Sequence, residues 1–144
     1  MTKTIAFYRV SELLNRDIDT QRDTVELYCK KHNLIIIDEI VEEITVKRSI
    51  NDRPAIIDLI SKVEILKPEF VIIPKLGGFA YAGDMVNLLT TFHAKGVGLI
   101  SVEETIWTIK DGKIQPSTTI MLQALNAAHE FEIDYLMTLE NLKK

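Results

Sequence analysis

Several residue types and patterns that would define a function are scarce in this chain of 144 residues. A single cysteine, Cys29, excludes an intramolecular disulfide, and its helical pattern favours the role of a buried small hydrophobic residue. No apolar run approaches the roughly 20 residues that a membrane span needs, and no signal-peptide pattern is present. We therefore expect a cytoplasmic protein that does not enter a membrane.

Signatures of nucleotide and metal sites are also missing. The sequence has no glycine-rich phosphate loop, no His-Glu-x-x-His motif and no pair of spaced cysteines. The three histidines fall in different predicted helices, so we predict neither a metal nor a cofactor. A small acidic group could bind a divalent ion, but a solvated strand end is the favoured interpretation. The group consists of Asp38, Glu39, Glu42 and Glu43.

Positive charge is both scarce and unevenly placed. The net charge is −4, which is the wrong sign for a free-standing DNA-binding protein. All the arginines fall in the first 53 residues: Arg9, Arg16, Arg22, Arg48 and Arg53. Arginine is the usual residue for gripping a phosphate at two points, so any anion site should be built from this part of the chain.

The sequence pattern predicts a single α/β domain. Apolar strand patterns alternate with helical patterns, and the connections are long enough for helical crossovers. The pattern predicts a mostly parallel four-stranded sheet with helices on both faces, in an α/β core over residues 1–116. Strands are expected near 3–11, 34–40, 70–73 and 97–102, helices near 20–32, 54–66 and 84–95, and a loop over 103–116 with a turn at Asp111-Gly112. Asp19 or Thr20 is expected to cap the first helix. The apolar positions predicted to face inward include Val25, Cys29, Ile56, Leu59 and Phe92.

Residues 117–144 are assigned to the same domain. Their pattern predicts a long helix that runs to about Lys143 and is roughly 39 Å in length. Its apolar residues are too many for one face. They recur on a four-three spacing and also on further sides, as a helix with several partners requires. We therefore predict a dimer or tetramer interface along residues 117–143.

A polar pair ends the first strand. Arg9 and Ser11 are two residues apart, which places a guanidinium and a hydroxyl on one face at the carboxyl end of the strand. Ligands and catalytic groups gather at such ends in α/β folds. A role for Ser11 as the N-cap of the next helix is equally compatible with the spacing.

A wider set of residues resembles the catalytic domain of serine recombinases, the resolvase and invertase family. The resemblance follows the order of elements along essentially the whole chain. It includes Arg9-Val10-Ser11, Gln21 at the start of the first helix, Arg53-Pro54 at the start of the second, Asp84-Met85, and a long last helix with Glu132 near its middle.

The resemblance implies DNA strand cleavage by a serine nucleophile, a covalent phosphoserine link, and strand exchange within a tetramer. Ser11 would be the nucleophile, Arg9 and Arg53 would hold the scissile phosphate, and Gln21 would help to position them. A serine hydroxyl is a weak nucleophile, and attack on a phosphodiester builds negative charge, so such a site needs fixed cations.

The sequence departs from the family pattern at the positions that supply this charge. Where the family usually has Asp-Arg-Leu-x-Arg, this chain has residues 77–81, Gly-Gly-Phe-Ala-Tyr. Phe7 replaces the strand-one tyrosine, and Ile133 replaces the arginine after Glu132. Losing one oriented charge costs on the order of 10² to 10³ in rate, so we expect a degenerate site with weakened or absent activity.

Three functions therefore stay open. The first is a weakened recombinase domain, and the second is a non-catalytic recombinase-like protein that acts in oligomerisation or regulation. The third is an unrelated domain that binds a small ligand through the glycine-rich loop 75–83. DNA binding is implied by the resemblance, but the acidic chain should bind DNA weakly on its own.

Overall fold

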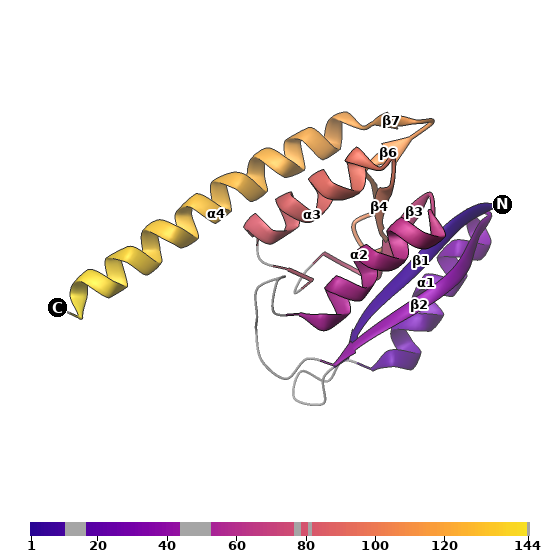
Figure 1. Ribbon diagram of the computed structural model, residues 1–144, viewed down its shortest axis with the longest axis horizontal. Helices are drawn as coiled ribbons and strands as arrows, with labels where there is room; N and C mark the ends of the chain where they lie inside the picture. The colour runs from indigo at the N-terminus through magenta and orange to yellow at the C-terminus, as the bar shows by residue number, and fades with distance from the viewer. Residues whose placement is uncertain (11–16, 44–52, 77–78, 81, 144) are drawn as a thin grey trace.

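The computed structural model describes residues 1–10, 17–43, 53–76, 79–80 and 82–143. Strands and helices alternate through the first hundred residues, and a long helix ends the described chain (Figure 1). The alternating elements are β1 (Thr2–Val10), α1 (Ile18–Lys31), β2 (Leu34–Glu43), α2 (Pro54–Leu66), β3 (Phe70–Ile73), α3 (Ala82–Ala94) and β4 (Gly98–Ser101). They are followed by β5 (Ile106–Trp107), β6 (Ile109–Lys110), β7 (Lys113–Ile114) and α4 (Pro116–Leu142).

The central sheet has the order β2-β1-β3-β4-β5. The first four strands are parallel, which confirms the predicted fold class, whereas β5 pairs antiparallel with β4. In the register between β1 and β2, Phe7 lies opposite Ile40 and Arg9 opposite Glu42. The carboxyl ends of β1 and β2 therefore bring an arginine and a glutamate together.

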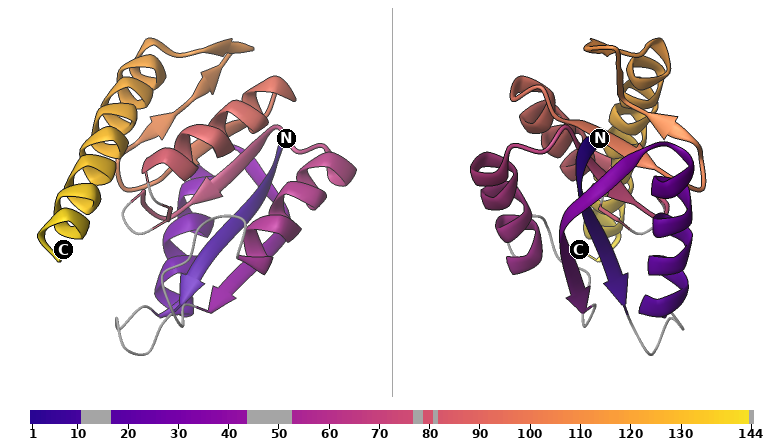
Figure 2. Two further views of the ribbon diagram at one scale, coloured as in Figure 1. Left: turned by 60° about the vertical axis from the view of Figure 1, so that its left-hand side comes forward. Right: turned by 90° about the vertical axis from the view of Figure 1, so that its right-hand side faces the viewer.

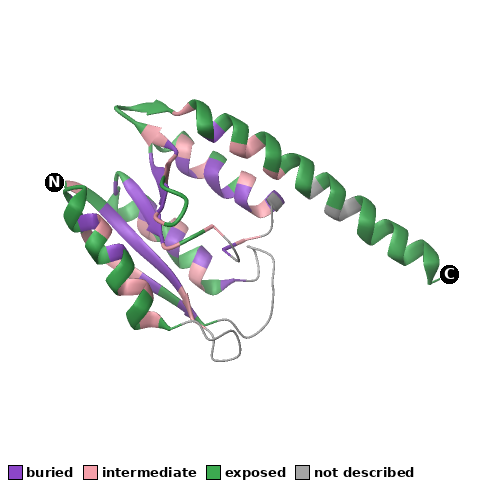
Figure 3. Ribbon diagram, turned by 180° about the vertical axis from the view of Figure 1, so that it is seen from behind, coloured by how far each residue is buried: buried purple, intermediate pink, exposed green. Residues whose placement is uncertain are grey.

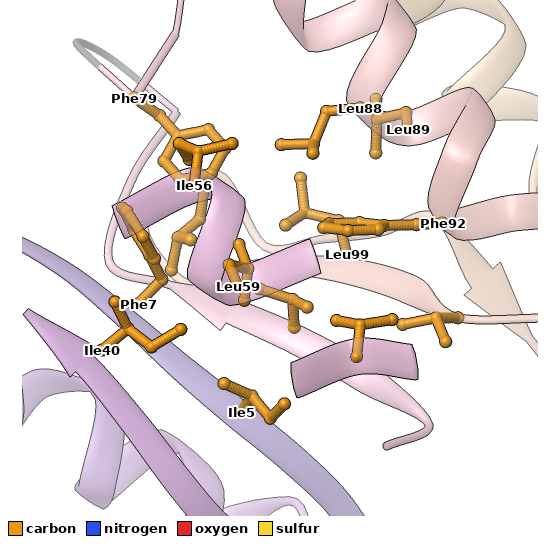
Figure 4. Close-up of a cluster of buried hydrophobic side chains, with 14 of the residues drawn as sticks. Ile5, Phe7, Ile40, Ile56, Leu59, Phe79, Leu88, Leu89, Phe92 and Leu99 are labelled. Carbon is orange, nitrogen blue, oxygen red and sulfur yellow. The ribbon is translucent and has the colours of Figure 1, made fainter. Parts of the chain in front are cut away.

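Helices cover both faces of the sheet (Figure 2). On one face, α2 and α3 bury Ile56, Leu59 and Phe92 against β1, β3 and β4, in the cluster of Figure 4. On the other face, α1 buries Val25 and Cys29. These positions match the predicted inward faces of the helices, because residues spaced three and four apart share one side of a helix.

The first helix begins earlier than the pattern suggested. Asp19 or Thr20 was the expected cap, but Asp17 is the N-cap of α1, and its carboxylate accepts from the Asp19 N–H at 3.1 Å. The Thr20 hydroxyl donates to the other carboxylate oxygen at 3.1 Å. Asp17 thus satisfies two donors of the first turn, which neither predicted cap does.

The predicted loop at 103–116 is wrong, because it contains three short strands. Asp111 and Gly112 form the predicted turn, with φ values of 51° and 74°, and join β6 to β7 as a hairpin. Buried Thr108 ties this region to the core, since its hydroxyl accepts from the Leu99 N–H at 2.7 Å. Two-residue strands are too short for a sequence periodicity, so tertiary pairing alone defines them.

The long helix α4 is present at Pro116–Leu142, close to the predicted range. Its first half packs on α3, where Met121, Leu122 and Leu125 touch the main core. Its second half projects away from the sheet (Figures 1 and 3), and the described side chains beyond Leu125 are exposed. Among the described residues, no helix is both long and apolar enough to cross a membrane.

Candidate active site

The candidate site lies at the carboxyl ends of β1 and β2, next to the start of α2. Arg9 is near the end of β1, Glu42 near the end of β2, and Arg53 is the N-cap residue of α2, directly before Pro54. Pro54 stands at the first helical position, where its missing N–H leaves no hydrogen bond unmade. Three segments distant in sequence therefore converge on one point.

Glu42 joins the two arginines. The Arg9 Nε–H donates to Glu42 Oε1 at 2.7 Å, and Arg53 donates to both carboxylate oxygens, at 2.9 Å from Nε and 2.5 Å from the terminal nitrogen. The side chains of Arg9, Glu42 and Arg53 are only 13%, 10% and 5% exposed. We call this group the Arg9–Glu42–Arg53 cluster. It carries a formal charge of +1, because one carboxylate offsets one of two guanidiniums.

Arg53 is also held from the opposite side by Phe79. Its second terminal nitrogen donates to the Phe79 carbonyl at 2.6 Å, and the guanidinium carbon lies 5.9 Å from the centre of the Phe79 ring. The ring in turn meets Phe7 edge-on at 5.2 Å. Four contacts thus fix the direction of one buried guanidinium, and such fixation is what a preorganised anion site requires.

Gln21 holds the backbone of Arg9. Its amide nitrogen donates to the Arg9 carbonyl at 2.8 Å, and its amide oxygen accepts from the Arg9 N–H at 3.3 Å. The Gln21 amide group therefore pairs with both backbone groups of Arg9, as a residue of a neighbouring strand would. These two bonds fix the backbone of Arg9, two residues before Ser11 in the sequence.

The sequence-predicted residues are only partly assembled in the described structure. Arg9, Arg53 and Gln21 come together, whereas Ser11 lies outside the described residues. Of the segment 77–81, the described Phe79 is buried and contributes its carbonyl and ring to Arg53, not a charge. The side chain of Glu132 also lies outside the description.

The Tyr8 hydroxyl on β1 does not replace the family's strand-one tyrosine, whose position is occupied by Phe7. Phe7 itself is buried in the main core, and Tyr8 points to the other face, among residues of the α1 cluster. Among the described residues, the buried Tyr8 hydroxyl has no hydrogen-bond partner, and burial raises its pKa well above the ordinary value. It therefore stays protonated at neutral pH and cannot serve as a base.

The acidic group on β2 is not the solvated strand end that was predicted. Asp38 pairs with Lys62 at 3.0 Å, Glu39 pairs with Arg22, and Glu42 is buried between two arginines. The hydrogen bond from Lys62 lowers the pKa of Asp38. Within the described residues, no group of three or more histidine, cysteine or acidic side chains is placed to hold a metal ion.

Glu42 is the site residue that sequence reasoning missed. Its signal lies in the pairing of β1 with β2, since the parallel register sets Glu42 directly opposite Arg9. A charged residue that faces an opposite charge in a nearly buried strand end is expected to pair with it. Without the register, the sequence does not indicate which of the four acidic residues at 38, 39, 42 and 43 pairs with Arg9.

Comparisons with known proteins identify the fold and the family of the chain. The chain is similar to the crystal structure of the N-terminal catalytic domain of TP901-1 integrase, with 24% identity, a TM-score of 0.73, and coverage of 93% of this chain and 98% of that chain. It is also similar to a resolvase family site-specific recombinase from Streptococcus pneumoniae, with 24% identity, a TM-score of 0.77, and coverage of 99% and 96%.

These identities are low enough that the two likenesses establish the fold alone. A comparison with curated proteins gives no match. The family model described as "Resolvase, N terminal domain" matches residues 4–139, which is most of the chain. The chain therefore belongs to the resolvase N-terminal domain family, and its fold is that of a serine recombinase catalytic domain.

Proposed function

We propose that this chain is a serine recombinase catalytic domain whose strand-cleavage activity is weakened. Ser11 is the nucleophile, Arg9 and Arg53 bind the scissile phosphate, and Gln21 positions the end of β1. The observation that supports this assignment most directly is the arginine pair, which meets at the carboxyl end of β1, where Arg9 precedes Ser11 by two residues. No metal takes part in the proposed chemistry.

The reaction exchanges one phosphate ester for another. The Ser11 oxygen forms a bond to phosphorus, the bond from phosphorus to one sugar oxygen breaks, the serine loses its proton, and the leaving oxygen gains one. Negative charge grows on the phosphoryl oxygens as the new bond forms. Arg9 and Arg53 supply fixed positive charge at this point, and their burial strengthens its effect.

Two features support the weakened activity. Residues 77–81 contain none of the arginines that the family usually places there. In addition, Glu42 accepts three hydrogen bonds from the guanidiniums of Arg9 and Arg53. A bound phosphate must share these donors with the carboxylate or displace it, so the effective positive charge is about half of what two arginines offer.

A homo-oligomer is part of the same proposal. The projecting half of α4 exposes large apolar side chains on more than one side of the helix. Exposed apolar surface of this extent is typical of a protein–protein interface. They include Phe131 (70% exposed), Leu136 (62%) and Leu142 (77%). Phe131 and Tyr135 stack with ring centres 6.4 Å apart and form one apolar strip. A second copy of the chain would cover these residues as a dimer or tetramer.

The second candidate function is oligomerisation without catalysis. The neutralising contact of Glu42 favours it, since the arginine pair is already satisfied within the protein. In that case the chain would assemble through α4, with itself or with an active relative, and regulate that partner. The two candidates differ in one measurable property, the formation of a covalent bond to DNA.

The test is covalent trapping on nicked DNA. The protein is incubated with a pool of short random-sequence duplexes that each carry a nick, so that a cleaved strand diffuses away and the phosphoserine link persists. We expect a slowly formed protein–DNA adduct on a denaturing gel. Ser11→Ala should abolish it and Arg53→Lys should reduce it by about 10² or more, because the fork of hydrogen bonds is lost.

Arg22→Lys is the matched control. Arg22 also pairs with a glutamate of β2 but lies on the other face of the sheet, so adduct formation should be unchanged. An adduct that survives Ser11→Ala overturns the nucleophile assignment. Complete absence of adduct from a chain that still forms oligomers overturns the catalytic proposal and favours the second candidate.

Sedimentation tests the oligomer separately. We expect the wild-type chain to form dimers or tetramers, and the double variant Phe131→Glu with Leu136→Glu to sediment as a monomer. Gln123→Glu adds the same kind of charge at an exposed position nearer the start of α4 and should leave the assembly intact. A wild-type chain that stays monomeric at high concentration contradicts the interface.

A further inference from the structure

Glu104 occupies a position at the carboxyl end of β4 that no catalytic assignment uses. Its carboxylate accepts a hydrogen bond from the hydroxyl of Ser101, a residue with no exposed surface. Both carboxylate oxygens also face the Leu76 N–H, at 3.2 and 3.3 Å. Glu104 thereby connects the end of β4 to the segment that follows β3.

This connection fixes the position of Leu76. The ladder between β3 and β4 continues past the strands, with Val102 N–H donating to the Ile73 carbonyl at 3.0 Å and Glu103 N–H donating to the Pro74 carbonyl at 2.9 Å. Glu104 then takes the next donor along, the Leu76 N–H. The Leu76 carbonyl accepts from the Phe79 N–H at 3.0 Å, so the position of Leu76 determines that of Phe79.

Phe79 in turn holds Arg53. Its carbonyl accepts from Arg53 at 2.6 Å, its ring lies beneath the guanidinium, and it is only 3% exposed. An unbroken series of hydrogen bonds thus runs from Ser101 through Glu104, Leu76 and Phe79 to Arg53. It reaches the Arg9–Glu42–Arg53 cluster from the side opposite Glu42.

We propose that Glu104 is a positioning residue for Arg53, acting through the hydrogen bond between the Leu76 carbonyl and the Phe79 N–H. The consequence for DNA cleavage rests on the proposed function, but the positioning itself does not. A carboxylate suits this role because hydrogen bonds to a charged acceptor are roughly twice as strong as neutral ones. One carboxylate also satisfies a buried hydroxyl and a backbone N–H together, which alanine cannot do.

The test reads Arg53 directly, by nuclear magnetic resonance of the arginine Nε–H groups. The Arg53 Nε–H donates to Glu42 in a buried site, so it should give a slowly exchanging signal. Arg53→Lys identifies this signal by removing it. The Arg22 Nε–H, which donates to Glu39 at 2.9 Å, is the internal reference on the other face of the sheet.

In Glu104→Ala we expect the Arg53 Nε–H signal to shift and to exchange with water at least about tenfold faster, as loss of a charge-assisted hydrogen bond predicts. The Arg22 signal should be unchanged. Glu104→Gln, which keeps an acceptor oxygen, should restore much of the protection. Glu103→Ala is the matched control, because it removes the same charge one residue away while its backbone contact to Pro74 remains.

Two results would overturn the proposal. The first is an Arg53 signal that is unchanged in Glu104→Ala while the Leu76 amide exchanges faster, because Glu104 would then be only a local cap for Leu76. The second is an equal loss of protection at Arg53 and at the backbone amides of the central strands, which would contradict a specific effect on Arg53. Neither readout requires cleavage, so an inactive wild-type chain would refute the proposed function and leave the positioning role standing.

Discussion

Glu42 and Glu39, three residues apart on β2, both bind arginines, yet in very different surroundings. Glu42 is shared by Arg9 and by Arg53 at the start of α2, whereas Glu39 binds Arg22 of α1. The helices α1 and α2 lie on opposite faces of the sheet (Figure 2). The Arg22 and Glu39 side chains are 37% and 32% exposed, against 5% and 10% for Arg53 and Glu42. The same chemical pair is therefore a solvated contact on one face and a buried cluster on the other.

The difference determines what each contact can do. Exposed ion pairs are screened by water and salt, so they contribute little to stability or to charge at a distance. A buried pair that loses one partner leaves an uncompensated charge in a low dielectric, which is costly. The net charge and the stability of the Arg9–Glu42–Arg53 cluster thus depend on Glu42, and the pair at Glu39 provides a matched control for each experiment.

The largest expected effect is on stability. Glu42→Ala leaves two buried guanidiniums facing each other, and we expect the free energy of unfolding to fall by about 3–5 kcal/mol. Glu39→Ala should leave the unfolding midpoint almost unchanged. Urea unfolding followed by circular dichroism measures both, and equal midpoints for the two variants would contradict the distinction between the faces.

A smaller effect is expected on DNA binding. Glu42→Gln raises the charge of the cluster from +1 to +2 and frees donors for phosphate, so affinity for a short duplex should rise several-fold. The slope of log affinity against log salt should steepen by about 0.9, the value for one additional phosphate contact. Glu39→Gln changes the net charge equally and should have little effect. Weaker binding by Glu42→Gln would mean that the carboxylate orients the arginines for phosphate and does not compete with it.

Much of this arrangement could be predicted from sequence because it follows local rules. The inward faces of α1, α2 and α3, the buried strands and the proline at the start of α2 all reflect periodicity or backbone constraints. The role of Glu42 could not be predicted in this way. It depends on which residue of β2 lies opposite Arg9, and a β-bulge between Thr4 and Ile5 shifts that register. The contact of Phe79 with Arg53 was equally invisible, since a backbone carbonyl carries no sequence signal.

A still smaller effect should come from His93, a partly buried histidine in the last turn of α3. His93 lies 3.0 Å from the Thr108 hydroxyl, and burial lowers its pKa below the ordinary value of 6.5. The unfolded chain therefore binds a proton that the folded chain resists, so the contribution to stability is complete above pH 6.5 and declines as the pH falls through that value. Unfolding measured between pH 8 and 5 should show this decline, and His93→Gln should flatten it. A slope that survives the substitution would assign the effect to another group.

The smallest expected effect concerns the chemistry of Cys29, which lies in the cluster on the same face as Glu39. Burial raises the pKa of the Cys29 thiol to about 11, so roughly one molecule in 10³ carries a thiolate at pH 8. Alkylation by iodoacetamide should therefore be slow in the folded chain and fast in urea. Glu39→Ala, which alters only the exposed contact, should leave the native rate unchanged, whereas Glu42→Ala should raise it by increasing the population of unfolded chains. Equal rates in the two variants would mean that local opening of α1 exposes Cys29, and that this face is uncoupled from the buried cluster on the other side of the sheet.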